Sequence, residues 1–248
     1  MDFDFKNPLH ILALIILSIS FFLIFVLPIM TFFVLQDMPN YLEEVDISEI
    51  VALQSQIIII AVFIIVPILW YVLVNKLGTK EIFSRLKLVK DNLGTAFLWG
   101  FLAAIIIFAL IFAITLALIA FGYDPNELSN IPDIQRLFSP ITIFFIVGIQ
   151  PIAEEIYFRG FLLEKIEKYG GNWFSIAITA TLFGIAHFSY GKIFPAMMPI
   201  VMGIVLGYIV FKTKNLYSAI VAHVAFNLTS LSLSYIGQEI MEQASVIL

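Results

Sequence analysis

The sequence contains no cysteine and few charged residues. Among its 248 residues, 12% are charged, about half the share found in an ordinary soluble domain. The absence of cysteine excludes disulfides, thiolate metal sites, thiol nucleophiles and S-acylation. The net charge is −5 and no long basic block occurs, so nucleic acid is not an expected partner.

In contrast to charged residues, apolar residues are abundant. They make up 61% of the chain, and the mean hydropathy is +1.04. A soluble domain of this length has too little interior to bury so much apolar surface. The same composition excludes intrinsic disorder. The sequence therefore predicts an integral, multi-pass membrane protein, which would lie in the cell membrane if its source is prokaryotic.

Long apolar stretches recur along the chain. A helix needs about 20 mostly apolar residues to cross about 30 Å of hydrocarbon, and these stretches are continuous rather than alternating, which favours helices over a barrel. We expect an all-α, polytopic transmembrane helical bundle of about seven spans. The predicted spans are 9–35, 52–75, 94–121, 139–163, 173–190, 194–212 and 216–236.

Cations and anions are distributed unequally between the connections. The 76–92 connection holds five lysine or arginine residues, whereas the connections on the other side are mostly acidic. Because cytoplasmic loops carry an excess of Lys and Arg, the N-terminus is expected inside. Residues 80–90 alternate apolar and basic side chains, which favours a short interfacial helix over a solvated loop.

Ionisable residues within the spans are few and gather in the fourth, fifth and seventh stretches. Burial of a charge in the bilayer is costly, so such residues are usually functional. Glu154 and His187 are equally far from the turn at 169–172, so antiparallel helices would place them at one depth. The full set is Glu154, Glu155, Arg159, His187 and His223, with Asn227 as a polar neighbour.

Spacings of four residues place several of these side chains on shared helix faces. Glu155 can pair with Arg159, His223 shares a face with Asn227, and Phe183 can form a wall beside His187. The simplest interpretation of the Glu155–Arg159 pair is structural, since pairing lets a helix insert. Gly148 and Gly184 would allow neighbouring helices to approach closely.

The clustered residues suit the attack of water on an amide. A buried carboxylate beside a neutral histidine can hold a water and accept its proton. A second histidine with an asparagine on one face can stabilise an oxyanion. The chain has neither a zinc-protease His-Glu-x-x-His motif nor a Gly-x-Ser-x-Gly elbow. A metal site of one Glu and two His remains an alternative at this point.

Three short motifs resemble those of a known family. They are Glu154-Glu155-x-x-x-Arg159, Phe183-x-x-x-His187 and His223-x-x-x-Asn227. In this order they are similar to the motifs of the CAAX protease and bacteriocin-processing (CPBP/Abi) group, which includes the type II CAAX prenyl endopeptidases. The resemblance covers about 139–236, which would be the catalytic helical core. Residues 1–138 would be N-terminal helices, and residues 237–248 a C-terminal tail.

The resemblance implies an intramembrane glutamate-type endopeptidase that requires no cofactor or metal. Glu154 and His187 would activate water, His223 and Asn227 would form the oxyanion hole, and Glu155 and Arg159 would support the site. The substrate would be a prenylated CAAX protein or a related membrane-associated peptide, and the site is expected to open toward the inner side. A scaffold, a bacteriocin-immunity protein and a proton-coupled transporter are the alternatives.

Overall fold

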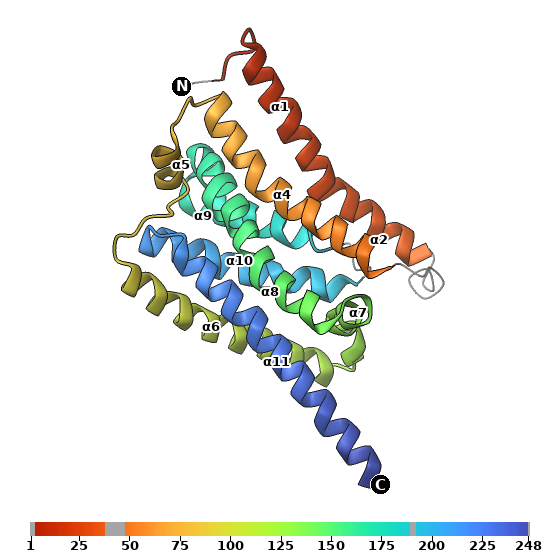
Figure 1. Cartoon of the computed structure of the whole chain (residues 1–248). Coiled ribbons are helices and arrows are strands. Elements are labelled where there is room, and N and C mark those ends of the chain that lie inside the picture. Colours follow the sequence, from red (N-terminus) through yellow and green to blue (C-terminus); the bar gives the residue numbers. More distant parts are fainter. Residues whose placement is uncertain (1–2, 38–47, 189–191, 248) are drawn as a thin grey trace.

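All regular secondary structure in the described part of the chain is helical. The computed structural model describes residues 3–37, 48–188 and 192–247, and no strand occurs in these ranges. Figure 1 shows the helices packed as one bundle, with the two termini at opposite ends. In order, the helices are α1 (Pro8–Phe21), η1 (Phe22–Val26), α2 (Leu27–Asp37), α4 (Glu49–Leu73), α5 (Thr79–Arg85), α6 (Leu93–Ala120), η2 (Pro125–Glu127), α7 (Ile131–Leu137), α8 (Pro140–Glu155), η3 (Ile156–Leu162), α9 (Leu163–Ile185), α10 (Ile193–Thr213) and α11 (Tyr217–Ile247).

Six helical segments within these ranges are long and apolar enough to cross a membrane. This makes the protein an integral, multi-pass membrane protein, as its composition predicted. The segments are Pro8–Asp37, Glu49–Leu73, Leu93–Ala120, Pro140–Ile185, Ile193–Thr213 and Tyr217–Ile240. Their bounds agree with the predicted stretches to within a few residues, except that the fourth and fifth stretches form one segment.

That segment, Pro140–Ile185, is a hairpin. The rings of Phe158 and Phe183 lie 5.0 Å apart, whereas a straight helix would separate them by about 37 Å. The chain reverses at Gly171, whose φ of 74° is a conformation that favours glycine. The fourth and fifth predicted spans are therefore the two antiparallel arms of this segment, joined where the sequence predicted the turn at 169–172.

The connections gather at two ends of the bundle, called here the α5 end and the α7 end. At the α5 end, Glu164 accepts hydrogen bonds from Tyr71 and Arg85, which joins α4 and α5 to the hairpin. The side chain of Asn215 donates to the carbonyl oxygens of Val89 and Asp91. These bonds join the 76–92 loop to the 213–217 turn and, through Arg85, to Glu164 of the hairpin. The first half of the predicted 80–90 helix forms α5.

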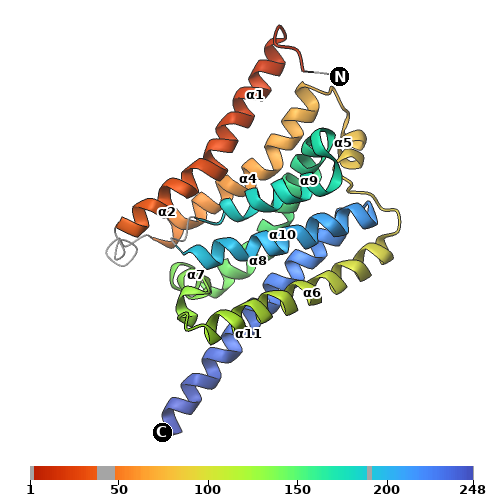
Figure 2. The same cartoon turned by 180° about the vertical axis from the view of Figure 1, so that it is seen from behind.

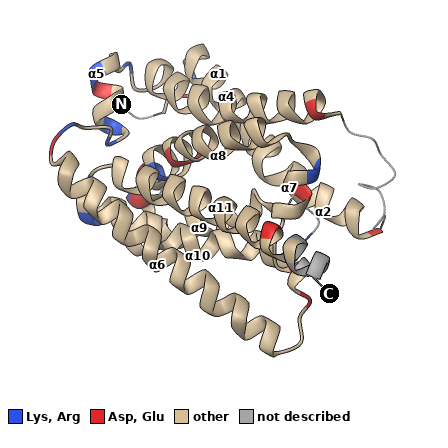
Figure 3. Ribbon diagram, turned by 60° about the horizontal axis from the view of Figure 1, so that its bottom comes forward, with Lys and Arg blue, Asp and Glu red and all other residues tan. Residues whose placement is uncertain are grey.

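Positive charge collects at the α5 end, as Figure 3 shows. Ten of the 13 lysine and arginine residues lie there by sequence position. At the α7 end, Lys192 pairs with Asp133 at 2.7 Å, and Glu49 accepts a 2.8 Å bond from the backbone nitrogen of Ser139. The ten lysine and arginine residues at the α5 end are Lys6, Lys76, Lys80, Arg85, Lys87, Lys90, Lys165, Lys168, Lys212 and Lys214.

Most buried core residues lie between α8 and α11, and η1, α4 and α6 contribute the rest. Figure 2 shows α10 between α9 and α6, and α11 packs on both α6 and α8. A Cβ atom at Gly184 would lie 2.8 Å from the carbonyl oxygen of Ala196, so the glycine lets α9 and α10 approach closely, as predicted. Gly148 has no such neighbour within 4 Å, so its predicted role in close packing is wrong. Residues 237–247, which belong to the predicted C-terminal tail, continue helix α11.

Candidate active site

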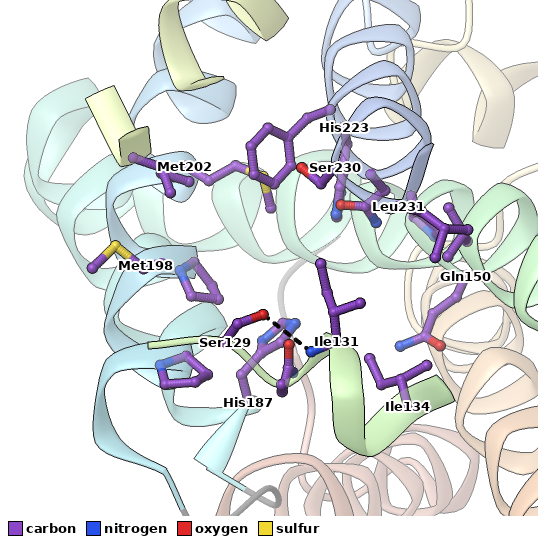
Figure 4. A pocket seen from close by; sticks show the side chains of 18 of the residues that line it. Ser129, Ile131, Ile134, Gln150, His187, Met198, Met202, His223, Ser230 and Leu231 are labelled. Atoms are coloured by element: carbon purple, nitrogen blue, oxygen red, sulfur yellow. Dashed lines mark hydrogen bonds between the residues drawn. The ribbon is translucent and has the colours of Figure 1, made fainter. Parts of the chain in front are cut away.

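A cavity of about 370 Å³ lies inside the bundle between α6, α8, α10 and α11. Glu154, His187, His223 and Asn227 all line it, although they come from three separate parts of the chain. Figure 4 shows His187 and His223 on different sides of this space. The structure therefore brings together the four residues that the sequence predicted as catalytic.

Glu155 faces away from the cavity and is held in an ion pair. Its Oε1 atom accepts a 2.9 Å hydrogen bond from Nη1 of Arg159, and both side chains are fully buried. The guanidinium carbon of Arg159 lies 4.3 Å from the centre of the Phe183 ring, which gives the cation a second favourable contact. The predicted pair of Glu155 with Arg159 is thus present.

The same oxygen of Glu155 also holds His223. Nδ1 of His223 lies 2.9 Å from Oε1 of Glu155. A carboxylate paired with Arg159 is ionised and only accepts hydrogen bonds, so Nδ1 of His223 carries a proton. The other ring nitrogen, Nε2, lies 3.7 Å from Oε2 of Glu154. His223 therefore bridges the two adjacent carboxylates.

Glu154 is the carboxylate that reaches the cavity. Its Oε1 atom accepts a 2.8 Å hydrogen bond from Nε2 of Gln150, one helical turn earlier on α8. Directly after Glu155 the chain changes from α-helix to the π-helix η3, which carries Arg159. Such π segments are often found at functional sites.

His187 lies just beyond the end of α9 with its ring fixed by the backbone. Nδ1 lies 2.7 Å from the carbonyl oxygen of Phe183, and the two rings are 4.7 Å apart. A carbonyl oxygen only accepts, so Nδ1 donates and Nε2 of a neutral ring keeps its lone pair. Phe183 forms the predicted wall beside His187 and also lies 5.7 Å from the ring of His223.

Asn227 lies one helical turn after His223 on α11. Its side chain makes no hydrogen bond to the residues that the structure describes, so the side-chain amide is available to a bound molecule. No group of three or more His, Asp or Glu side chains within the described ranges is arranged to hold a metal ion.

The cavity extends toward the α7 end. Its outer part is lined by Ser129, Asn130, Ile131 and Ile134, which belong to the loop before α7 and to α7 itself. Nζ of Lys192 binds both the carbonyl oxygen of Ser129, at 3.3 Å, and Asp133. The sequence analysis expected a site that opens toward the inner side; the lining residues lead to the end of the bundle opposite the basic α5 end.

Comparison with known proteins shows a family match for the segment that carries these residues. Residues 136–229 match the family model described as "Type II CAAX prenyl endopeptidase Rce1-like". This segment is an Rce1-like CAAX endopeptidase family domain. The predicted resemblance is thereby confirmed, and all three motifs fall inside the matched residues.

One curated relative of the chain comes from Bacillus subtilis. It is the uncharacterized protein YyaK, which is 34% identical over 89 residues. The match covers 34% of this chain and 30% of YyaK, so the chain matches less than a third of the relative's length. No solved structure matches the chain.

The Rce1-like domain contains one site residue that the sequence analysis missed. Gln150 binds the cavity-facing carboxylate of Glu154. A polar side chain within an apolar span, four residues before a glutamate, is the signal that points to it. The residues between 129 and 134 that line the outer part of the cavity lie just before the matched residues, and their sequence gave no such signal.

Proposed function

We propose that the protein is an intramembrane glutamate-type endopeptidase. It hydrolyses a peptide bond in a prenylated CAAX protein or a related membrane-associated peptide. One observation carries this proposal: Glu154 and His187 line a single cavity, while the neighbouring charges are paired behind it. Family membership of residues 136–229 supports the same class of activity.

Glu154 acts as the general base in this proposal. A water in the cavity is held between Oε2 of Glu154 and Nε2 of His187, which accepts because Nδ1 donates to the carbonyl oxygen of Phe183. The water oxygen attacks the carbonyl carbon of the peptide bond, and its proton passes to Glu154. Gln150 keeps the carboxylate oriented through its hydrogen bond to the other oxygen.

His223 and Asn227 stabilise the oxyanion. Since Nδ1 of His223 is engaged by Glu155, donation to the oxyanion must come from Nε2, so both ring nitrogens carry protons in this state. Before the attack, the buried cluster has two carboxylates, Glu154 and Glu155, and two cations, Arg159 and His223. After Glu154 has accepted the proton of water, the oxyanion carries the second negative charge, so the cluster stays neutral, which lowers the cost of its burial. The amide of Asn227 supplies a second donor.

Collapse of the tetrahedral intermediate completes the reaction. The carbonyl forms again, the C–N bond breaks, and the leaving nitrogen takes the proton that Glu154 received from water. The products are a carboxylic acid and an amine, so one water is consumed and the base returns to its first state.

The proposal is tested with purified protein in detergent and a quenched fluorescent peptide that ends in a farnesylated cysteine motif. Wild type, Glu154→Gln and His187→Ala are compared, each with and without excess chelator. The expected result is cleavage by wild type that is insensitive to chelator and is lost in both variants. Glu239→Gln, which changes an exposed carboxylate on α11, is the matched control and should retain activity.

Other outcomes have definite meanings. Cleavage that the chelator abolishes would return the metal site to consideration. Cleavage that persists in Glu154→Gln would refute the assignment of the base. If folded wild type cleaves neither this peptide nor an unprenylated one, the scaffold or immunity role takes first place, and Glu154→Gln should then leave the cellular phenotype intact.

A further inference from the structure

We infer that the proposed active site receives its substrate from the outer face of the membrane. Of the two substrate classes proposed above, this selects the membrane-associated peptide, as an exported peptide or the outward-facing segment of a membrane protein, over a prenylated protein attached to the inner face. This inference rests on the proposed function, and three independent features of the molecule support it.

The first feature is the position of the cavity lining. Besides the catalytic candidates, the lining includes Pro125, Ser129, Ile134 and Pro195, all of which belong to connections or helix starts at the α7 end. No residue of the 76–92 loop, the hairpin turn or the 213–217 turn lines the cavity. A molecule that enters along the cavity therefore comes from the α7 end.

The second feature is a closed layer between the site and the α5 end. The η3 and α9 turns that lead from Glu155 toward Glu164 bury Tyr157, Phe158 and Phe161 almost completely. Leu216, in the turn before α11, is also fully buried. Packed aromatic layers of this kind leave no passage for a peptide, so entry from the α5 end is blocked.

The third feature is the charge of the two ends. Ten of the 13 lysine and arginine residues lie at the α5 end, whereas Arg136 and Lys192 lie at the α7 end. Short loops rich in Lys and Arg remain on the cytoplasmic side. The α5 end is therefore inside, and the cavity opens outside.

The chemistry of the cavity fits a short peptide segment. Its volume of about 370 Å³ is at the lower end of the range for small-ligand pockets, which excludes a folded domain. Apolar walls from Ile143, Met198, Met202 and Phe226 suit apolar side chains. Polar side chains along the cavity, among them Ser129 and Ser230, can bind the peptide backbone.

The absence of cysteine makes a direct test possible. Single cysteines are placed at Glu127, exposed at the α7 end, at Lys80, exposed at the α5 end, and at Ser230, inside the cavity. Intact cells that express each variant are treated with a membrane-impermeant maleimide or, for Ser230→Cys, with a small charged thiosulfonate reagent. Thr115→Cys, a second cavity position, is used if Ser230→Cys does not fold.

The expected result is that Glu127→Cys and the cavity cysteine react in intact cells, while Lys80→Cys reacts only after permeabilisation. The reverse pattern for Glu127 and Lys80 would overturn the inference. A cavity cysteine that does not react from outside, when Glu127→Cys does, would also overturn it.

A second assay separates this inference from the proposed function. A peptide substrate is added to sealed right-side-out and inverted vesicles that contain wild type or Glu154→Gln. Cleavage by wild type only in right-side-out vesicles supports both proposals, and cleavage only in inverted vesicles overturns the side of entry. Labelling from outside without cleavage in either vesicle leaves the side of entry standing and refutes the peptidase function.

Discussion

Nδ1 of His223 donates a 2.9 Å hydrogen bond to Oε1 of Glu155, which joins the start of α11 to the end of α8. The same oxygen accepts a hydrogen bond from Arg159. The position and tautomer of His223 therefore depend on a residue that does not itself reach the cavity. This relationship gives the second glutamate of the pair a defined task, which is to orient the histidine and neutralise the arginine.

Replacement of Glu155 by Gln should strongly destabilise the protein. The variant keeps the shape of the side chain but leaves the buried charge of Arg159 uncompensated. Breaking one partner of a buried pair costs about 3–5 kcal/mol. Thermal unfolding in detergent measures the effect, with Glu239→Gln as an exposed control that should unfold as wild type does. Equal unfolding temperatures for Glu155→Gln and wild type would contradict the assignment.

Replacement of Gln150 by Met should reduce activity more than stability. The variant removes the donor to Glu154 while keeping an unbranched side chain of similar length. A hydrogen bond to a charged group contributes about 1.5–3 kcal/mol, which as a loss of transition-state stabilisation lowers kcat by about 10- to 160-fold. The proposed positioning role also predicts a changed pH profile of kcat, because the environment of the base changes. An unchanged kcat and pH profile would show that Gln150 does not position Glu154.

The attachment of α4 and α5 to Glu164 of the hairpin should stabilise the protein more through Tyr71 than through Arg85. Both donate to Glu164, but Tyr71 is buried whereas the side chain of Arg85 is 44% exposed. Loss of a buried hydrogen bond to a carboxylate costs about 1.5–3 kcal/mol, and loss of an exposed ion pair costs about 0.2–1 kcal/mol. Unfolding of Tyr71→Phe and Arg85→Gln tests the order, and a greater loss for Arg85→Gln would reverse the interpretation.

Two glycines of the hairpin should respond oppositely to alanine. At Gly184 the added Cβ would collide with Ile200 and the backbone of Ala196, and overpacking of this kind costs about 1–3 kcal/mol. At Gly148 no atom lies within 4 Å of the new Cβ, so the gain in helix propensity should stabilise the protein by about 0.5–1 kcal/mol. Unfolding temperatures of Gly184→Ala and Gly148→Ala, measured together, check both signs. Destabilisation of both variants to the same extent would show that packing does not distinguish the two sites.

Much of the site was predictable because the bilayer makes its residues conspicuous. Ionisable side chains are costly in hydrocarbon, so Glu154, Glu155, Arg159, His187 and His223 stand out in an apolar sequence. Helical periodicity then predicted the Glu155–Arg159 pair and the contact of Phe183 with His187, and both are present. Gln150 escaped notice because an uncharged amide costs less to bury and therefore stands out less.

The sequence alone determined the membrane class, the helical spans and the candidate residues, since hydropathy and helix spacing are local properties of the chain. Tertiary structure decided what depends on the packing of distant segments. It set His223 of α11 between Glu154 and Glu155 of α8. It also directed the cavity toward the α7 end, because the packed aromatic layer of η3 closes the other side. No local sequence pattern encodes these relationships, because each arises from the packing of side chains that belong to separate helices.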